Sequence, residues 1–451
     1  MKRLFGALFS VEPTERAVWA LVGIAVLGTL SAGLPILDDA ALAAALALAL
    51  GLVADIVLAG SPRKVEVARV VPALWAQGAP TEVVREISSR RRLDLVVTDA
   101  LPRGASEDGR GGEHELRVQV AAGERARVPS SLTLYRRGEQ AFGRLTVRTR
   151  GPLGLVMRRA RHEVETTARV VPDLARVGAR AERLLRGQDE GGARRRRARQ
   201  EGRELESLRE YQRGDDIRLI EWKASARRGS LVVKRMQPET RQDVVVLLDT
   251  GRQLAGRHEA ADGGAPRLDV ALQAALTLAA AALSFGDRVG MLAFAGDVRG
   301  WVAPLAGKGH LRRCNDAISA SEVLPEEADY GAAVRFLLSR QKRRAMVAIV
   351  TDVLDEPSAR ALAGAVATLR GRHLPVVVAV GDPALTRLAR ERGGDAHGAA
   401  VRLAAERLLS HRRAALAALA AAGAVVVDAP AQRAAAQAVR AYLGVKAAGR
   451  L

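Results

Sequence analysis

An aspartate at the end of an apolar run is the clearest chemical feature of this 451-residue chain. The run Asp243–Asp249 reads DVVVLLD, breaks at Gly251 and precedes an amphipathic helical pattern. Open parallel sheets bind ligands at the carboxyl ends of their strands. Asp249 therefore marks a candidate ligand site.

The common catalytic patterns do not occur in the sequence. Its seven histidines are scattered, and there is no Gly-Lys-Ser phosphate loop or Gly-x-Ser-x-Gly elbow. Asp215 and Asp216 form a pair of acids, but adjacent side chains rarely converge on one substrate. Arg213 and Arg218 are available to neutralise them. An ion-pair role is favoured over a catalytic one.

The segment 202–235 mixes many charges with aromatic and aliphatic residues, which favours a folded segment over a flexible linker. We predict that it is structural, that Tyr211 and Trp222 are largely buried, and that Asp215 or Asp216 pairs with an arginine.

The pattern of this segment resembles the signature of the family catalogued as domain of unknown function 58. The matching residues are Gly202, Glu204, Leu208, Arg209, Glu210, Tyr211, Gly214, Asp215, Asp216, Arg218, Ile220, Trp222, Ser225, Ala226 and Arg227. Two shorter stretches agree with it, RGPLGL at 150–155 and VVPDL at 170–174. The resemblance implies a membrane-anchored protein with a C-terminal von Willebrand factor type A-like domain. It also implies partnership with a MoxR-type AAA+ ATPase.

A von Willebrand factor type A-like domain implies a divalent-cation site. Its ligands come from an Asp-x-Ser-x-Ser motif, a later Thr and an Asp after the fourth strand. The chain keeps Asp249 and offers Asp352, but Gly251 and Gln253 stand at the serine positions and the Thr has no clean match. Because Mg²⁺ needs several oxygen ligands, we expect weak Mg²⁺ binding or none. Arg252 is predicted to neutralise the carboxylates, and the site is predicted to remain a partner-facing surface.

Residues 243–445 alternate apolar runs with helical patterns, which predicts a doubly wound α/β domain with a mostly parallel sheet. The predicted strands are Asp243–Asp249, Arg288–Phe294, Gly300–Pro304, Ala345–Thr351, Pro375–Val380 and Ala424–Val427. The predicted helices are Leu268–Leu283, His310–Ser319, Gly331–Arg340, Ser358–Arg370, Val401–Ala422 and Gln432–Leu443.

Residues 1–62 are predicted to form a transmembrane helical hairpin with spans at about 17–37 and 40–60. Basic residues flank the pair of spans and the turn between them is acidic, so both ends are expected on the cytoplasmic side of a bacterial inner membrane. The alternative, a cleaved signal peptide, does not explain the second span. Asp55 interrupts that span, and an interfacial carboxylate is favoured over a transport residue.

Residues 63–172 alternate with period two between Gly- and Pro-bearing turns, which predicts an all-β, sandwich-like domain. Residues 173–242 are interpreted as a basic linker followed by the signature segment. The run Arg194–Arg199 is predicted to be a solvated loop, with contact to anionic lipid headgroups as the alternative.

The formal net charge is +20, but aromatic residues make up only 3% of the chain and the basic residues are scattered. No nucleic-acid partner is therefore expected, because base stacking needs aromatic side chains. Cys314 is the single cysteine, so no internal disulfide forms.

We expect a non-catalytic, membrane-anchored adaptor without a cofactor, working with the MoxR-type ATPase in assembly or envelope-related processes. One alternative is a metal-dependent hydrolase that uses Asp249 and Asp352. A second is a nucleic-acid-binding protein.

Overall fold

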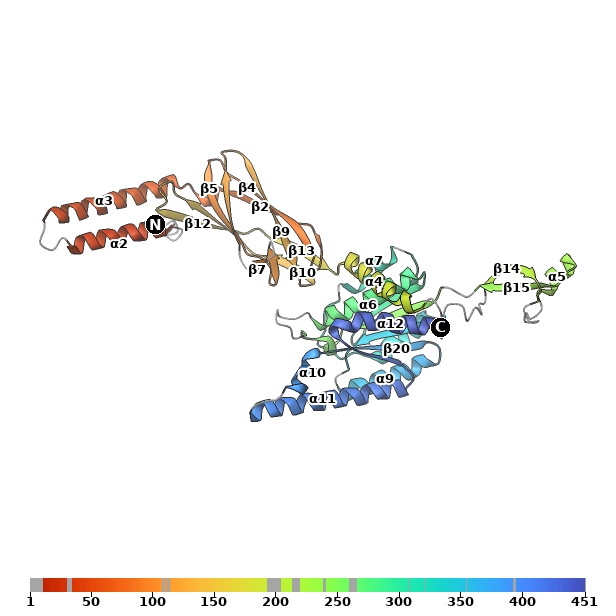
Figure 1. The fold of residues 1–451 in the computed structure, drawn as a ribbon. Helices are drawn as coiled ribbons and strands as arrows, with labels where there is room; N and C mark the ends of the chain where they lie inside the picture. Colours follow the sequence, from red (N-terminus) through yellow and green to blue (C-terminus); the bar gives the residue numbers. More distant parts are fainter. Residues whose placement is uncertain are drawn as a thin grey trace. The chain divides into compact units, whose positions relative to one another are not determined.

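The computed structural model divides the chain into two compact units, Met1–Asp173 and Leu174–Leu451 (Figure 1). The structure describes residues 11–30, 35–107, 110–111, 114–192, 204–212, 220–237, 241–258, 266–307, 309–319, 321–353, 355–391 and 395–450.

The first unit begins with two apolar helices, α2 (Glu15–Leu30) and α3 (Pro35–Leu58), which contact each other (Figure 1). The helical segment Asp39–Lys64 is long and apolar enough to cross a membrane, with a mean hydropathy of 2.5, and only 6% of it is buried. Leu42, Leu46 and Leu50 are exposed on it. Because exposed apolar surface is unfavourable in water, this helix suggests membrane association.

The rest of the first unit consists of β-sheets. One five-stranded sheet has the order β1 (Val11–Pro13), β12 (Val156–His162), β11 (Leu145–Arg150), β5 (Leu93–Asp99) and β8 (His114–Val120). The other has the order β2 (Glu66–Val70), β4 (Pro80–Ser88), β9 (Arg125–Leu134), β6 (Ala105–Glu107) and β7 (Arg110–Gly111). A third sheet joins β10 (Gly138–Phe142), β13 (Thr166–Val171) and β3 (Leu74–Ala76).

These strands are antiparallel, as the period of two predicts, except that β13 and β3 pair in parallel. Alternate side chains such as Leu95, Val97, Leu145 and Val147 point inward and form one of the apolar clusters of this unit. The opposite face of the same strands carries polar side chains.

The second unit is built on a six-stranded sheet. Its order is β18 (Val298–Leu305), β17 (Arg288–Phe294), β16 (Asp243–Asp249), β19 (Ala345–Thr351), β20 (Leu374–Gly381) and β21 (Val425–Pro430). All neighbours are parallel except β17 and β18. The strand order reverses between β16 and β19, and such a switch point is where open α/β sheets form their ligand crevice.

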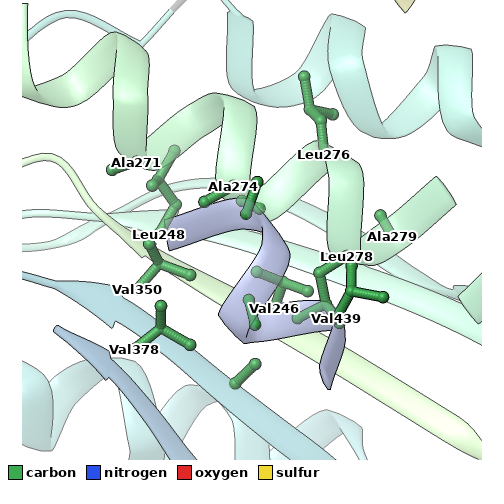
Figure 2. Close-up of a cluster of buried hydrophobic side chains, with 14 of the residues drawn as sticks. Val246, Leu248, Ala271, Ala274, Leu276, Leu278, Ala279, Val350, Val378 and Val439 are labelled. Carbon is green, nitrogen blue, oxygen red and sulfur yellow. The ribbon is translucent and has the colours of Figure 1, made fainter. Parts of the chain in front are cut away.

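Helices cover both faces of this sheet. One face packs against α4 (Leu174–Gly192), α6 (Arg267–Ser284), α7 (His310–Ser319) and α12 (Ala434–Ala447). The other packs against α8 (Tyr330–Arg340), α9 (Glu356–Arg370) and α11 (Ala396–Ala421). Figure 2 shows Val246, Leu248, Val350 and Val378 of the sheet close to Ala271, Ala274 and Leu278 of α6 and Val439 of α12.

Helix α6 is also long and apolar enough to span a membrane, but 72% of it is buried. It is a core helix of this unit.

Two helices of this unit differ from the sequence-based predictions. Helix α4 lies in the region interpreted as a basic linker, yet its residues Val177 and Ala181 join the same core. The helix α10 (Pro383–Arg390) is not among the predicted helices. Asp382 caps it by accepting a hydrogen bond from the Ala384 N–H.

Candidate functional site

Asp249 ends β16 at the switch point and is fully buried. Its Oδ1 accepts a hydrogen bond from the backbone N–H of Gly251 at 2.8 Å. Its Oδ2 accepts from the Tyr330 hydroxyl at 2.8 Å and from the Thr351 hydroxyl at 2.6 Å. Both carboxylate oxygens are therefore occupied by donors of the protein itself.

Burial dominates the electrostatics of this carboxyl group. Burial raises the pKa of Asp249, while the hydrogen bonds from Thr351, Gly251 and Tyr330 oppose the rise. Burial also raises the pKa of Tyr330 well above its ordinary value, so the phenol remains a donor. Tyr330 thus supplies a hydroxyl in the region where no threonine could be matched in the sequence.

Asp352 follows β19 and is also buried. One of its oxygens accepts hydrogen bonds from the Arg412 guanidinium and from the backbone N–H of Val353. The other lies 3.6 Å from the Arg267 guanidinium. Burial raises the pKa of Asp352, and the charge of Arg412 acts against that rise.

The two arginines extend the network to further carboxylates. Arg412 of α11 is 2.9 Å from Asp428, and Arg267 of α6 is 2.6 Å from Asp382. Asp352 therefore lies in the middle of a chain of ion pairs. We name the set Asp249, Tyr330, Thr351, Asp352, Arg267 and Arg412 the strand-end cluster.

The prediction that Arg252 neutralises these carboxylates is wrong. Arg252 is half-exposed and pairs with Glu327 at 2.6 Å and Asp355 at 3.6 Å, outside the cluster. Gln253, at the second serine position, donates to Asp355 and to the Ser358 hydroxyl. Arg267 and Arg412 take the neutralising role, and no local sequence signal marks them, because each is far from Asp352 in the sequence.

The strand-end cluster does not suit a divalent cation. The Asp249 oxygens are occupied by three donors, and Asp352 faces two guanidinium groups whose positive charge would repel a metal ion. Within the described parts of the chain, no three or more His, Cys, Asp or Glu side chains form a group able to hold a metal. Because Asp249 and Asp352 are buried, they also cannot contact a partner directly.

A groove of about 700 Å³ lies beside the cluster at the ends of β20 and β21. Arg387 and Arg390 of α10 and Arg413 of α11 line it, together with apolar Leu385 and Leu409. Arg412 and Asp428 join it to the ion-pair chain. The strand ends thus present an ion-paired, partly apolar surface.

The signature segment forms a two-stranded antiparallel sheet, β14 (Glu204–Glu210) with β15 (Val232–Gln237), and the short helix α5 (Trp222–Arg228). Ser225 of α5 fixes this helix to β15: its hydroxyl donates to the Glu221 carbonyl and accepts from the Val232 N–H, both at 2.9 Å. Gly229 ends the helix with φ 69°, a left-handed conformation that glycine adopts without strain. Gly202, Gly214, Asp215, Asp216 and Arg218 lie outside the described residues, so the expected ion pair of Asp215 or Asp216 is not tested.

The prediction that Trp222 is buried is wrong. Trp222 is 65% exposed, and Tyr211 is half-buried. The small apolar contact of this segment consists instead of Ile220, Val232 and Val233. Ser225 makes the contact of α5 with β15, whereas Trp222 is the first residue of the helix and lies outside that contact.

The first unit contains two buried polar networks whose partners no sequence spacing signals. In one, Arg69 and Arg85 both bind Asp99, and Arg85 also binds Glu107 at 2.7 Å. All four side chains are buried, and buried charges are ordinarily paired in this way. In sequence they lie on separate strands, so no spacing signals the network.

The second network surrounds Asp55 of α3. Its carboxylate accepts hydrogen bonds from the backbone N–H groups of Leu153, Leu155 and Val156 at 2.7, 2.7 and 2.9 Å. The first two residues belong to the RGPLGL stretch at 150–155. Asp55 is thus enclosed by a loop of its own unit, which is the arrangement of a structural carboxylate.

Comparison with known proteins places these observations in a family. The family model described as "Protein of unknown function DUF58" matches residues 207–397. This match confirms the family resemblance that the signature segment predicts, and this chain carries a DUF58 segment.

The chain is similar to the "Uncharacterized protein YeaD" of Bacillus subtilis (strain 168), with 30% identity over 170 residues. The match covers 36% of this chain and 42% of that protein, so less than half of the relative is spanned. A solved structure, the conserved hypothetical protein BatB from Bacteroides thetaiotaomicron, aligns with 16% identity and a TM-score of 0.30 over 46% of this chain and 99% of that one. The CARDB domain of a Pyrococcus furiosus protein aligns with 11% identity and a TM-score of 0.17 over 24% and 94% of the two chains.

Proposed function

We propose that this protein is a non-catalytic, membrane-anchored adaptor that docks a partner protein through its signature segment. The observation that carries the proposal is the exposed Trp222 on a hydrogen-bonded scaffold. Tryptophan is enriched among the few residues that dominate binding energy at protein interfaces. Leu231, 46% exposed, adds apolar surface to the same segment.

The strand-end cluster supports a binding role over an enzymatic one. Its carboxylates are buried and bonded to internal donors, so neither is free to act as a base, nucleophile or metal ligand. We expect no micromolar Mg²⁺ binding by calorimetry to the full-length protein. Micromolar binding that disappears in Asp249→Ala would contradict this expectation and favour the metal-dependent hydrolase.

The sheet order of the second unit, with one antiparallel edge strand and helices on both faces, supports a von Willebrand factor type A-like fold for this unit. The apolar helices α2 and α3 support a hairpin anchor in a bacterial inner membrane, with the remaining chain in the cytoplasm. The family resemblance points to a MoxR-type AAA+ ATPase as the partner, in assembly or envelope-related processes.

The test is binding of a MoxR-type AAA+ ATPase from the same organism to the full-length protein in detergent. We expect Trp222→Ala to weaken binding at least tenfold, because truncation of an interface hot spot costs about 2 kcal/mol or more. We expect its melting temperature to stay close to that of the wild type, because the side chain is exposed.

Lys223→Ala is the matched control, since Lys223 is exposed on the same helix. It should bind within about threefold of the wild type, because most contacts around a hot spot contribute little. Equal binding by Trp222→Ala and the wild type would exclude the signature segment as the docking element. A large loss of thermal stability in Trp222→Ala would show that the segment is structural, as first predicted.

A further inference from the structure

A polar hollow of about 350 Å³ lies on the outward face of the sheet formed by β5, β11 and β12 in the first unit. The polar side chains that line it are Thr98, Thr146, Arg144, Arg148, Arg159 and Arg161. The rest of the lining is Ala100 and Gly143, so no carboxylate lines the hollow.

The strand register brings the arginines together on one face. Arg148 of β11 is directly opposite Arg159 of β12, and Thr146 is opposite both Arg161 and Thr98. Like charges directly opposite each other destabilise an antiparallel pair. An anion between the two arginines would remove this repulsion.

The carboxylates near the hollow stand at its exposed rim. Glu115 is 2.7 Å from Arg148, Glu12 is 3.4 Å from Arg159 and Glu163 is 3.1 Å from Arg144, and all three glutamates are about half-exposed or more. Exposed ion pairs of this kind contribute little and are screened by salt. Arg161 is exposed and makes no ion pair with any residue that the structure describes.

Three polar groups of the hollow have no hydrogen-bond partner. The Thr98 side chain is 9% exposed, and its Oγ1 is buried without a partner; the same is true of the Nε atoms of Arg148 and Arg159. Buried polar groups in folded proteins are ordinarily hydrogen-bonded. Unmatched polar groups that gather beside one hollow add to the polarity of its lining.

We propose that this hollow binds a phosphate group, either of free phosphate or of a lipid headgroup. A phosphate offers several acceptor oxygens and a negative charge, and arginine recognises it through parallel N–H donors. The hydroxyls of Thr98 and Thr146 complete the donor set. The headgroup source is structurally accessible because β12 is tied to the end of the apolar helix α3. The Arg158 guanidinium donates to the carbonyl of Ile56 in α3 at 3.5 Å and to that of Gly60, just after the helix, at 2.8 Å.

The test uses the full-length protein in a phosphate-free maltoside detergent. Inorganic phosphate and monomeric dihexanoyl phosphatidylglycerol are titrated separately by calorimetry, against chloride at equal ionic strength. Tighter binding of inorganic phosphate identifies a free phosphate site, and tighter binding of the lipid identifies a headgroup site. Either result supports the proposal, and no binding of either probe overturns it.

Two variants test whether the phosphate group binds in this hollow. Thr98→Val removes the unmatched hydroxyl and keeps the side-chain shape, and we expect about tenfold weaker binding with a melting temperature no lower than that of the wild type. Arg161→Gln should also weaken binding about tenfold, since it removes a charge-assisted hydrogen bond.

The control is Arg117→Gln, because Arg117 is exposed on β8 of the same sheet and does not line the hollow. It should bind like the wild type. The proposal fails if Thr98→Val and Arg161→Gln bind as tightly as Arg117→Gln.

Discussion

At the scale of single residues, a buried carboxylate must be neutralised, and Arg412 does this for Asp352. Removing one partner of a buried ion pair leaves an uncompensated charge in a poor solvent. Arg412 also holds Asp428, so it joins the end of β21 to the end of β19. The strand-end cluster is therefore a structural element of the second unit.

We expect Arg412→Ala to destabilise the second unit by about 3–5 kcal/mol, since Asp352 then stays buried with Arg267 alone nearby. Urea unfolding followed by circular dichroism measures the change. Arg413→Ala is the matched control, because Arg413 is the exposed neighbour on the same helix, and it should stay within about 0.5 kcal/mol of the wild type. Equal effects of the two variants would show that the ion-pair chain contributes no net stability.

His373 makes the stability of the second unit depend on pH. It is 2% exposed and neither ring nitrogen has a hydrogen-bond partner. Burial, and then the charges of Arg372 and Arg344, lower the pKa of His373 from its ordinary value of 6.5. The unfolded chain therefore binds a proton more readily than the folded one, and stability falls as the pH drops below about 6.5.

We expect the wild type to lose more stability than His373→Gln between pH 7.5 and pH 5.5, by up to about 1.4 kcal/mol, because pH 5.5 lies about one unit below the ordinary histidine pKa that the unfolded chain keeps. Urea unfolding at the two pH values measures this difference. His411→Gln is the control, because His411 is exposed, and it should follow the wild type. A loss in His373→Gln as large as in the wild type would assign the pH dependence to other groups.

At the scale of elements, the RGPLGL loop shows how a motif acts through its backbone. Its N–H groups enclose the Asp55 carboxylate, and the Thr14 hydroxyl donates to the Gly154 carbonyl at 2.6 Å. The loop thus joins α3, the start of α2 and the strand β12.

Gly151→Ala should destabilise the first unit, because a Cβ at this position would overlap the Asp55 carboxyl group. We expect a lower melting temperature and faster proteolysis of the full-length protein in detergent. Gly23→Ala provides the comparison, since a Cβ there meets no atom within 4 Å. If both variants melt like the wild type, the loop tolerates displacement from Asp55.

At the scale of the whole molecule, the charge pattern around the apolar helices determines the proposed topology. Lys2, Arg3 and Arg16 precede the predicted first span and Arg63 and Lys64 follow the second. The acidic residues Asp38 and Asp39, predicted to lie in the turn, belong instead to the beginning of α3. The positive-inside rule places such basic flanks in the cytoplasm. The two compact units then share one membrane anchor.

Reporter fusions test this topology in bacterial cells. A fusion at Leu451 should be active with a cytoplasmic reporter, and one in the segment between α2 and α3 should be active with a periplasmic reporter. The reverse pattern would contradict the proposed orientation. A periplasmic signal from both sites would favour the cleaved signal peptide.

The sequence by itself determined most of the strands and helices within residues 243–445. The strands β16, β17 and β19 begin and end at the predicted residues, because each is a continuous apolar run bounded by polar residues. The helix α7 also coincides with its predicted range, and the other predicted helices differ by a few residues at their ends. Local periodicity carries this information, since it reports which face of an element must be buried.

Only the tertiary structure decided which polar side chains meet. Arg412 is 60 residues from Asp352, and Leu153 is 98 residues from Asp55, so these partners depend on how distant elements pack. The exposure of Trp222 was decided in the same way, because burial depends on what covers a side chain and not on its own hydrophobicity. Composition and spacing identify the groups that need partners, but only the packing of the chain determines which partners they find.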